Sequence, residues 1–339
     1  MAAESESNVQ RIGFLLLPEF PLYALVPAIE ALRIANQNRG RRLYDWRLIS
    51  TNGKPVPAGN GMMMSVHTDI AKAEFLPVVI VVGGNHPLQH VARPTLNWLR
   101  RLDRHGALLG AIDTGLFALA EAGLIGDRSV TLHWEAMAMF RERYPHIAVE
   151  EQVLVFDRGR VTCAGGHAAL DMILHLIARD HGAALAQRVA NGFVQPLIRH
   201  ETDPQRASID TLMGDRAAEF RRVLHIMETN IGTPLRLAAL CRESGLSAHR
   251  VTTVLREATG LPPMRYYLKL RLAAARTALF YGDDAVEDVA SACGFSCPEV
   301  FSRAFKTEFG LPPRGFRARF SRDQLLRFRP EMHDRLELA

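Results

Sequence analysis

Residues 289–313 read VASACGFSCPEVFSRAFKTEFGLPP, and the final tetrapeptide of this stretch, Gly310 to Pro313, also occurs letter for letter as Gly260 to Pro263. The residues before both copies share one layout, with an apolar face, a glycine, an apolar residue and a serine. An exact repeat with matched surroundings indicates an internal duplication. Each copy predicts a helix, a tight turn at Gly245 or Gly294, and a second helix capped by Ser247 or Ser296.

The second helix of each copy is the candidate to enter the major groove of DNA. In one copy Val251, Val254, Leu255 and Ala258 form the apolar stripe, and in the other Phe301, Ala304, Phe305 and Phe309 do. The opposite faces carry arginine, lysine and hydroxyl side chains, which suit base edges and phosphates. The DNA-contacting candidates are Ser247, Arg250, Thr253, Arg256, Glu299, Ser302, Arg303 and Lys306. For either helix alone, a face that is simply exposed to solvent is the alternative. The presence of two such faces in duplicated units favours DNA binding.

Residues 265–281 predict one continuous helix that sets the distance between the two turn units. Recognition helices on one side of a duplex need to lie about 34 Å apart to reach successive major grooves. Residues 1–213 hold equal numbers of basic and acidic side chains, so the formal net charge of +5 belongs to residues 214–339. A basic excess in this part of the chain suits a polyanionic partner.

Four motifs in this region resemble the DNA-binding domain of the AraC/XylS family. They span residues 237–247, 267–276, 289–296 and 301–310, so the resemblance covers about residues 235–317. It implies an all-α domain with two helix-turn-helix units that binds double-stranded operator DNA and contacts RNA polymerase. His249, Thr252 and Pro298 depart from the family's usual residues. These departures affect which DNA bases are read and leave the expected fold unchanged.

Residues 11–200 alternate short apolar runs with amphipathic helical patterns, which predicts a doubly wound α/β domain with a parallel sheet. Strands are expected at 12–17, 45–50, 78–82, 108–112, 153–157 and 161–164, and helices at 23–36, 95–105, 115–122, 135–144, 168–178 and 182–193. The expected domains are a disordered segment 1–10, the α/β domain 11–200, a linker 201–215, the DNA-binding domain 216–320 and a tail 321–339.

A sharp strand-to-helix turn runs through Asp113, Thr114 and Gly115, where related folds present a nucleophile. Adjacent amides and the helix dipole are expected to hold the Asp113 carboxylate ionised. The segments 12–16, 30–36, 82–84, 110–115, 119–124 and 131–134 resemble the DJ-1/PfpI family, and the pairing of both domains resembles the GlxA-like regulators. In the enzymes that turn residue is normally cysteine, so Asp113 implies a binding pocket in place of an active site.

The carboxyl ends of the strands are where an open α/β sheet binds ligands. The candidates there are Phe20, Gly83, Gly84, Asp113, Thr114, His133 and Trp134. Asp113 and Trp134 together suit a cationic effector such as an amine, an amino acid or a betaine. Core packing is the alternative for Phe20 and Trp134, a structural histidine for His133, and a helix cap for Asp113.

The favoured interpretation is a cytoplasmic, homodimeric, metabolite-responsive activator of catabolic genes that is not an enzyme. A hydrolase or lyase with Glu30, Asp113 and His133 as acid-base groups, fused to a DNA-binding module, is the first alternative. A domain that only dimerises is the second. No signal peptide, membrane span, metal site or cofactor is expected, since the N-terminus is polar and the four cysteines are scattered.

Overall fold

The computed structural model describes residues 9–195, 197–205, 217–282 and 284–319. The contacts divide the chain into two compact units after Gln205. We call residues 9–205 the α/β unit and residues 217–319 the helical unit. Gln10 belongs to a strand, which differs from the expected segment 1–10. Residues 1–8, the linker residues 206–215 and the tail 321–339 lie outside the described residues.

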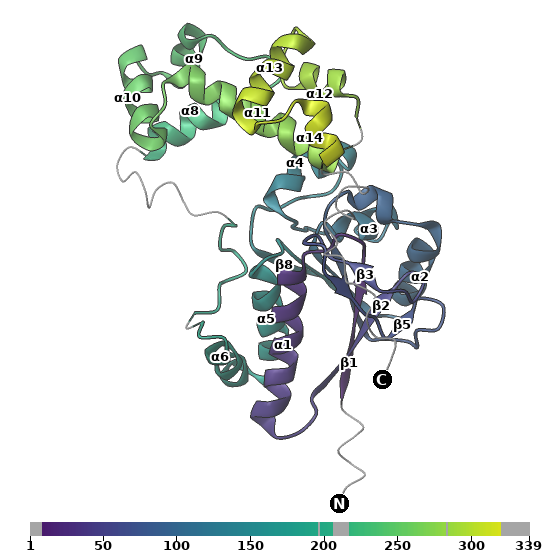
Figure 1. The fold of residues 1–339 in the computed structure, drawn as a ribbon. Coiled ribbons are helices and arrows are strands. Elements are labelled where there is room, and N and C mark those ends of the chain that lie inside the picture. The colour runs from purple at the N-terminus through teal and green to yellow at the C-terminus, as the bar shows by residue number, and fades with distance from the viewer. Residues whose placement is uncertain (1–8, 196, 206–216, 283, 320–339) are drawn as a thin grey trace, which may run out of the picture. The chain divides into compact units, whose positions relative to one another are not determined.

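A seven-stranded sheet forms the centre of the α/β unit (Figure 1). Its strands, in spatial order, are β5 (Thr68–Asp69), β2 (Tyr44–Ser50), β1 (Gln10–Leu16), β6 (Val78–Gly83), β7 (Leu108–Asp113), β9 (Arg160–Cys163) and β8 (Leu154–Asp157). All neighbours pair in parallel except β8 and β9, which are antiparallel. The short hairpin of β3 (Val56–Pro57) and β4 (Met63–Met64) stands apart.

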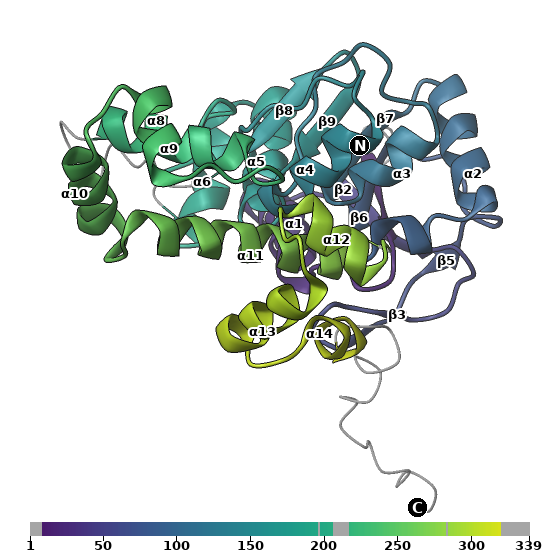
Figure 2. The same cartoon turned by 90° about the horizontal axis from the view of Figure 1, so that it is seen from above.

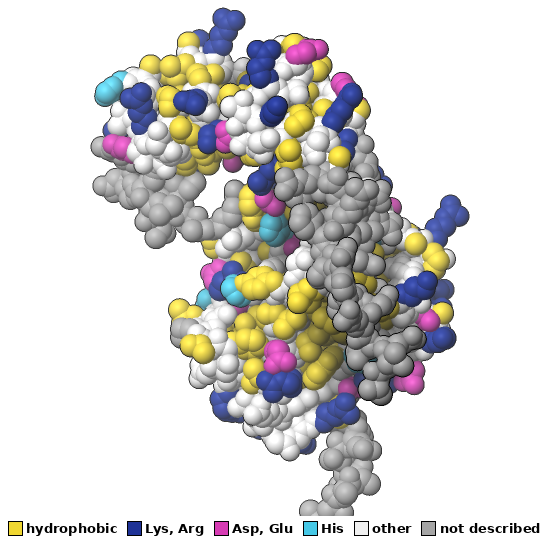
Figure 3. Space-filling view, in the orientation of Figure 1, with side chains coloured by type: hydrophobic (Ala, Val, Ile, Leu, Met, Phe, Trp, Pro, Cys, Tyr) yellow, Lys and Arg dark blue, Asp and Glu magenta, His cyan; other side chains and the backbone are white. Residues whose placement is uncertain are grey.

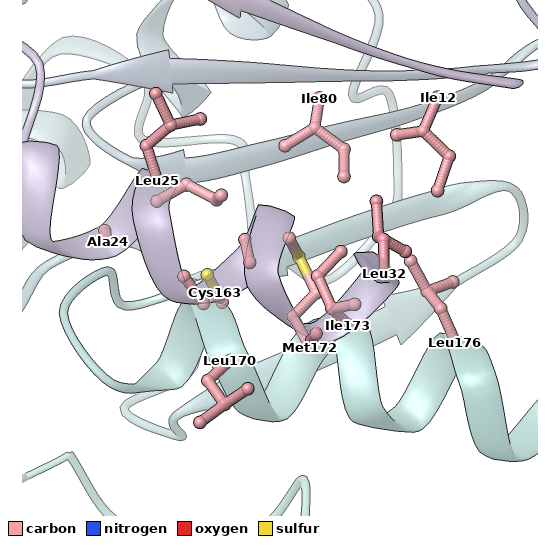
Figure 4. Close-up of a cluster of buried hydrophobic side chains, with 14 of the residues drawn as sticks. Ile12, Ala24, Leu25, Leu32, Ile80, Cys163, Leu170, Met172, Ile173 and Leu176 are labelled. Atoms are coloured by element: carbon pink, nitrogen blue, oxygen red, sulfur yellow. The ribbon is translucent and has the colours of Figure 1, made fainter. Parts of the chain in front are cut away.

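Helices cover both faces of the sheet, as a doubly wound fold requires. One face packs against α1 (Leu22–Arg39), α5 (Ala168–His181) and α6 (Ala183–Gly192). The other face packs against α2 (Arg93–Arg104), α3 (Leu116–Glu121) and α4 (Met137–Arg143), with 3-10 turns at Pro87–His90 and Trp134–Ala136. Figure 4 shows Ile12 and Ile80 of the sheet pointing toward Leu32 of α1 and Ile173 of α5.

The doubly wound class is confirmed, with local corrections. The sheet is not wholly parallel, because β8 returns through a tight turn to pair with β9. The expected helix 135–144 is a 3-10 turn followed by α4. Strands β3, β4 and β5 have two residues each, which is too short to leave a period-two pattern.

The helical unit has two hydrophobic cores joined by one long helix. Its elements are α8 (Ala217–Thr229), α9 (Leu237–Ser244), α10 (Ala248–Thr259), α11 (Pro263–Tyr281), α12 (Val286–Ala292), α13 (Pro298–Phe309) and α14 (Pro313–Arg319). Tyr267 of α11 packs into the first core, and Leu272, Ala275 and Leu279 pack into the second. Figure 2 shows α11 running from the α8–α10 group to the α12–α14 group. The expected connecting helix is confirmed.

The duplication extends further than the sequence comparison indicated. Arg222 of α8 and Arg271 of α11 lie the same number of residues before Gly245 and Gly294. Arg222 donates to the carbonyl of Ser244, and Arg271 donates to the carbonyls of Cys293 and Gly294. Each repeat therefore has three helices, α8–α9–α10 and α11–α12–α13, with an arginine of its first helix bound at its turn.

Candidate ligand site and DNA-reading helices

Asp113 ends β7 in a left-handed conformation, with φ of 60°. The backbone around it is so close that neighbouring positions require glycine. A Cβ on Gly115 would lie 2.2 Å from the Val81 carbonyl oxygen, and one on Gly83 would lie 2.4 Å from the Gly115 nitrogen. The buried Thr114 hydroxyl donates a 2.5 Å hydrogen bond to the Gly84 carbonyl. This packing holds the Asp113 carboxyl group at the carboxyl edge of the sheet.

Burial governs the protonation of Asp113. Desolvation raises the pKa of this carboxyl group to about 7, the Thr114 backbone amide opposes that rise, and the charge of Glu135 adds to it. The expectation of a carboxylate held firmly ionised by the helix start is therefore wrong, because desolvation outweighs the amide. Asp113 is a carboxyl group that gains or loses its proton near neutral pH.

His133, Trp134 and Glu135 approach the Asp113 edge from the segment before α4. The Trp134 side chain is 41% exposed, and its ring lies 5.7 Å from the His133 ring. Burial lowers the pKa of His133, and its Nδ1 accepts a 3.4 Å hydrogen bond from the Glu135 backbone amide. His133 is therefore neutral at neutral pH, and the charges next to Asp113 are acidic.

Tyr23 and the glycines after β9 form the other side of this edge. A Cβ on Gly165 would lie 2.6 Å from the Asp113 Oδ2, and one on Gly166 would lie 3.6 Å from the Tyr23 ring. Tyr23 is 54% exposed and packs edge-on against His167 with ring centroids 4.8 Å apart. Two exposed aromatic residues, Tyr23 and Trp134, therefore belong to the segments that lie around the Asp113 carboxyl group. These residues define what we call the Asp113 edge: Tyr23, Asp113, His133, Trp134, Glu135, Gly165, Gly166 and His167.

The remaining expected site residues serve the backbone or the core. Phe20 is fully buried among hydrophobic side chains, and Gly83, Gly84 and Thr114 shape the turn. Glu30, offered as an acid-base group, forms a 2.7 Å ion pair with Arg33 on α1. Tyr23, Glu135 and His167 were missed, because they come from the start of α1, a 3-10 turn and the residue before α5, and no sequence spacing joins them.

Cys163 does not replace the missing nucleophile. It is fully buried, and burial raises the pKa of its thiol to about 12, with the nearby Asp113 carboxyl group adding to the rise. A thiol with so high a pKa is protonated at neutral pH and is a poor nucleophile. No group of three His, Cys, Asp or Glu within the described residues is arranged to hold a metal ion.

Residues 195 and 197–205 bind along the α/β unit, and we call them the strap. Asp171 of α5 is completely buried and receives Arg199 Nε at 2.8 Å and Nη2 at 2.7 Å. Gln195 Nε2 also donates to Asp171, and His175 Nε2 lies 2.8 Å from the Arg199 carbonyl oxygen. The positive charge of Arg199 also acts on the Tyr23 hydroxyl, so the strap passes near the Asp113 edge.

The strap ends next to residues 131 and 132, which directly precede His133 of the Asp113 edge. Gln205 Nε2 lies 2.9 Å from the Thr131 Oγ1, 2.9 Å from the Leu132 carbonyl oxygen and 3.0 Å from the Gln152 carbonyl oxygen. The Val153 amide donates to the Asp203 carbonyl. Residues 201–205 are thus bonded to the α/β unit, which corrects their assignment to a polar linker.

In the first repeat, α10 begins with Ser247, whose hydroxyl accepts a hydrogen bond from the Arg250 amide. Val251, Val254 and Leu255 are buried as expected, whereas Ala258 is exposed near the helix end. Arg250 turns toward α8 and forms a 2.7 Å ion pair with Glu219. Arg256 is exposed and Thr253 is partly exposed.

In the second repeat, α13 begins with Cys297, not with Ser296. Pro298 occupies the first turn, and no side chain caps the helix start. The Cys297 thiol instead donates to a Glu299 carboxylate oxygen at 2.7 Å. Phe301 and Phe305 are buried, while Glu299, Arg303 and Lys306 are exposed and Ser302 is partly exposed.

The two recognition helices can be compared through their first buried residues, Val251 and Phe301. Counting from these, Lys306 is equivalent to Arg256 and Arg303 to Thr253, while Arg250 is equivalent to Val300. The same register pairs Glu299 with His249 and Ser302 with Thr252, both outside the expected set. In the space-filling view, Lys and Arg side chains spread over the visible face of the helical unit, between hydrophobic ones (Figure 3).

Family models match both units of the chain. The DJ-1/PfpI family matches residues 10–179, and a helix-turn-helix domain matches residues 240–319. No helix within the described ranges is both long and apolar enough to cross a membrane.

Curated relatives extend over nearly the whole chain. The HTH-type transcriptional regulator CdhR of Pseudomonas aeruginosa is 38% identical over 91% of this chain and 92% of its own length. GbdR of the same species is 37% identical over 91% of this chain and 84% of its own length. GlxA of Rhizobium meliloti is 36% identical over 94% of this chain and 99% of its own length. An AraC family transcriptional regulator of Pseudomonas putida is similar in structure, with 28% identity, a TM-score of 0.50, and 54% of this chain and 99% of that chain covered.

Proposed function

The chain belongs to the HTH-type transcriptional regulators that join a DJ-1/PfpI domain to an AraC-type helix-turn-helix domain, and from this we propose that it is a metabolite-responsive activator of catabolic genes. Membership establishes a DNA-binding regulator, and the effector and the sign of regulation are our proposal. The observation that carries it is the Asp113 edge, where a carboxyl group and two exposed aromatic rings stand in place of a nucleophile.

The operator is read by α10 and α13. Arg256 and Lys306 occupy equivalent, exposed positions on the two helices and are the primary candidates for base or phosphate contacts. Thr253, Ser302, Arg303 and Glu299 complete the exposed faces, with Ser247 at the start of α10. Arg250 has a smaller part, because its guanidinium group is already paired with Glu219.

The effector is a small cation such as an amine, an amino acid or a betaine. Asp113 and Glu135 supply negative charge, and Trp134 and Tyr23 supply exposed rings whose faces attract cations. Neutral His133 adds no opposing positive charge. A cation would also favour the ionised form of Asp113, so effector binding and proton release are coupled.

The effector acts by shifting populations between domain arrangements of a homodimer in the cytoplasm. The strap supports this mechanism, because Gln205 at its end is bonded to Thr131 and Leu132, which directly precede His133 of the Asp113 edge. Contact between the bound regulator and RNA polymerase would complete activation, as the family resemblance implies.

Catalysis is not part of the proposal. The hydrolase or lyase alternative requires an activated nucleophile near Asp113 and an acid-base partner at Glu30. Cys163 is buried and protonated, and Glu30 is engaged by Arg33, so neither residue supports that chemistry. A domain that only dimerises would leave the ionisable carboxyl group of Asp113 and the exposed rings of Tyr23 and Trp134 without a role.

The test is binding of the full chain to the DNA upstream of its own gene, across a salt series and with a panel of amines, amino acids and betaines. We expect sequence-selective binding that weakens with salt and changes at least fivefold with one of the cations. Selective binding that no panel member alters would remove the sensor role. Binding no tighter than to random DNA at every salt concentration would remove operator recognition by these helices.

A further inference from the structure

The helical unit contains a groove of about 290 Å³ between α11 and α13. Its apolar lining comes from both helices and consists of Leu268, Leu272, Val300 and Ala304. Val300 is 53% exposed, which is unusual for a valine on a helix of a packed domain. Hydrophobic surface is thus left open beside a recognition helix.

The equivalent positions of the first repeat hold charged side chains in place of Leu268 and Val300. Glu219 and Leu268 are equivalent, because each lies three residues before the arginine bound at its turn, Arg222 or Arg271. Arg250 and Val300 are equivalent by the register of the recognition helices given above. In the first repeat these two positions hold the 2.7 Å ion pair between Arg250 and Glu219, which bridges α8 and α10. In the second repeat two aliphatic side chains replace the pair, and neither is long enough to close the gap.

A second replacement widens the difference between the repeats. Phe220 is buried in the first core, and its equivalent in the second repeat is Lys269. Lys269 lines the groove and forms a 2.8 Å ion pair with Glu308. The second repeat thus has a lysine in place of a large aromatic residue, and its ion pair between the first and third helices joins other positions than the pair of the first repeat.

The charges around the groove are mainly positive. Arg265, Lys269 and Arg303 line it, against the single carboxylate of Glu308, which Lys269 engages. Arg265 and Arg303 form no ion pair with any described residue, so their guanidinium groups are available to an anion. An apolar floor with unpaired guanidinium groups at its rim is complementary to an amphipathic anion.

We propose that this groove binds a small amphipathic carboxylate, with its alkyl part on Leu268, Leu272, Val300 and Ala304 and its carboxylate at Arg265 and Arg303. The volume is near the lower end of the roughly 300–1,000 Å³ range of small-molecule pockets, which suits a medium-length chain. Because Arg303 also belongs to the exposed face of α13, an occupied groove weakens DNA binding. That second consequence rests on the proposed function, whereas the binding itself does not.

The probe is sodium octanoate below its micelle-forming concentration, titrated into the full chain by calorimetry, with octylammonium as the charge-reversed probe. We expect saturable octanoate binding at one site and none for octylammonium. Arg303→Gln should weaken octanoate binding about tenfold, since it removes a charge-assisted contact. Arg314→Gln is the matched control and should change it less than twofold, because Arg314 is an exposed α14 arginine paired with Glu287.

The decisive variant is the double change Leu268→Glu with Val300→Arg, which builds the ion pair of the first repeat into the second. It should fold with an unchanged circular dichroism spectrum and abolish octanoate binding. Octanoate should also weaken the binding of the natural chain to the operator. It should have no effect on operator binding by this variant. Octanoate binding that survives the double change, or no binding to the natural chain, overturns the inference.

The two proposals fail separately in this design. If octanoate binds the natural chain and not the double variant, the groove inference is supported even if the chain shows no operator selectivity. Selective operator binding with no octanoate site leaves the regulator intact and overturns the groove. If octanoate does not bind and Arg265→Gln lowers the salt dependence of DNA binding, the arginines at the rim of the groove bind DNA phosphates instead.

Discussion

The side-chain amide of Gln205 lies 2.9 Å from the Thr131 hydroxyl oxygen and 2.9 Å from the carbonyl oxygen of Leu132, the residue before His133. Gln205 ends the α/β unit, and His133 belongs to the Asp113 edge. A displacement of the segment 131–134 therefore changes the hydrogen bonds of the residue that leads to the helical unit.

Gln205→Ala should separate effector binding from the DNA response. The variant keeps the Asp113 edge, so effector affinity should change less than threefold. The effector-induced change in operator affinity should fall to less than twofold, because the segment 131–134 no longer holds the strap. Calorimetry with the effector and operator titrations in its presence and absence measure both quantities.

Gln187→Ala is the matched control for that prediction, since Gln187 is an exposed glutamine of α6 outside the strap. It should leave both affinities and their coupling unchanged. A Gln205→Ala protein whose operator affinity still responds fully to the effector would show that the strap does not transmit the signal.

Asp113→Asn should change how stability depends on pH. In the natural chain the carboxyl pKa is about 7 when folded and near 3.8 when unfolded, so the unfolded state releases this proton first. Stability is therefore lost as pH rises from about 4 to 7, by roughly 2–4 kcal/mol for a shift of this size in a partly exposed group. Asparagine tolerates the left-handed backbone and does not titrate.

Urea unfolding at pH 5 and pH 8 measures this effect. The natural chain should be less stable relative to Asp113→Asn at pH 8 than at pH 5. An equal difference between the two proteins at both pH values would show that Asp113 has an ordinary pKa.

Effector affinity should rise with pH through the titration of Asp113. A permanently cationic effector interacts favourably only with the ionised carboxylate, so below pH 7 its affinity should fall by up to tenfold for each pH unit. Above pH 8 the affinity should level off. Calorimetric titrations from pH 5.5 to 8.5 test this, and Asp113→Asn should give a weak, pH-independent affinity.

Arg256→Ala and Arg250→Ala should have different effects on DNA binding. Arg256 is exposed on the reading face of α10, and its loss should cost about 1–3 kcal/mol of operator binding. Arg250 is held by Glu219, so its loss should change operator affinity less than threefold and mainly lower the stability of the first repeat. Operator titrations and thermal melts of both variants check this, and a larger operator defect in Arg250→Ala would reassign the reading face.

The sequence was most informative where a local rule determines the structure. Apolar runs located β1, β6 and β7 to within two residues, and one apolar stripe located α11, which was expected at 265–281. Where two local rules compete, prediction failed. Ser296 is a good capping residue, but Pro298 needs the first turn of α13, and the cap moves to Cys297.

Most of the Asp113 edge depends on contacts between residues distant in the chain, and therefore could not be predicted. The strand-to-helix turn indicated Asp113 itself, because glycines and a threonine surround it. Tyr23 comes from the first turn of α1 and Glu135 from the 3-10 turn before α4, and the pKa of Asp113 depends on burial that no spacing encodes. The hydrogen bonds of the strap likewise form between residues more than 20 positions apart.

Arg271→Lys should weaken the second repeat although it keeps the positive charge. The Arg271 guanidinium lies 4.1 Å from the centroid of the Phe295 ring, and Nε and Nη2 donate at 2.9 and 2.7 Å to two carbonyls at the turn. A lysine ammonium is a single point donor and cannot bind both carbonyls while stacking on the ring. We expect a loss of about 2–3 kcal/mol, measured by urea unfolding followed at the helical signal. Arg222→Lys, which gives up one carbonyl contact at 3.2 Å in the first repeat, should cost less than half as much. Equal losses in the two variants would mean that the ring and the second carbonyl contribute nothing, so that only the shared contact with the turn matters.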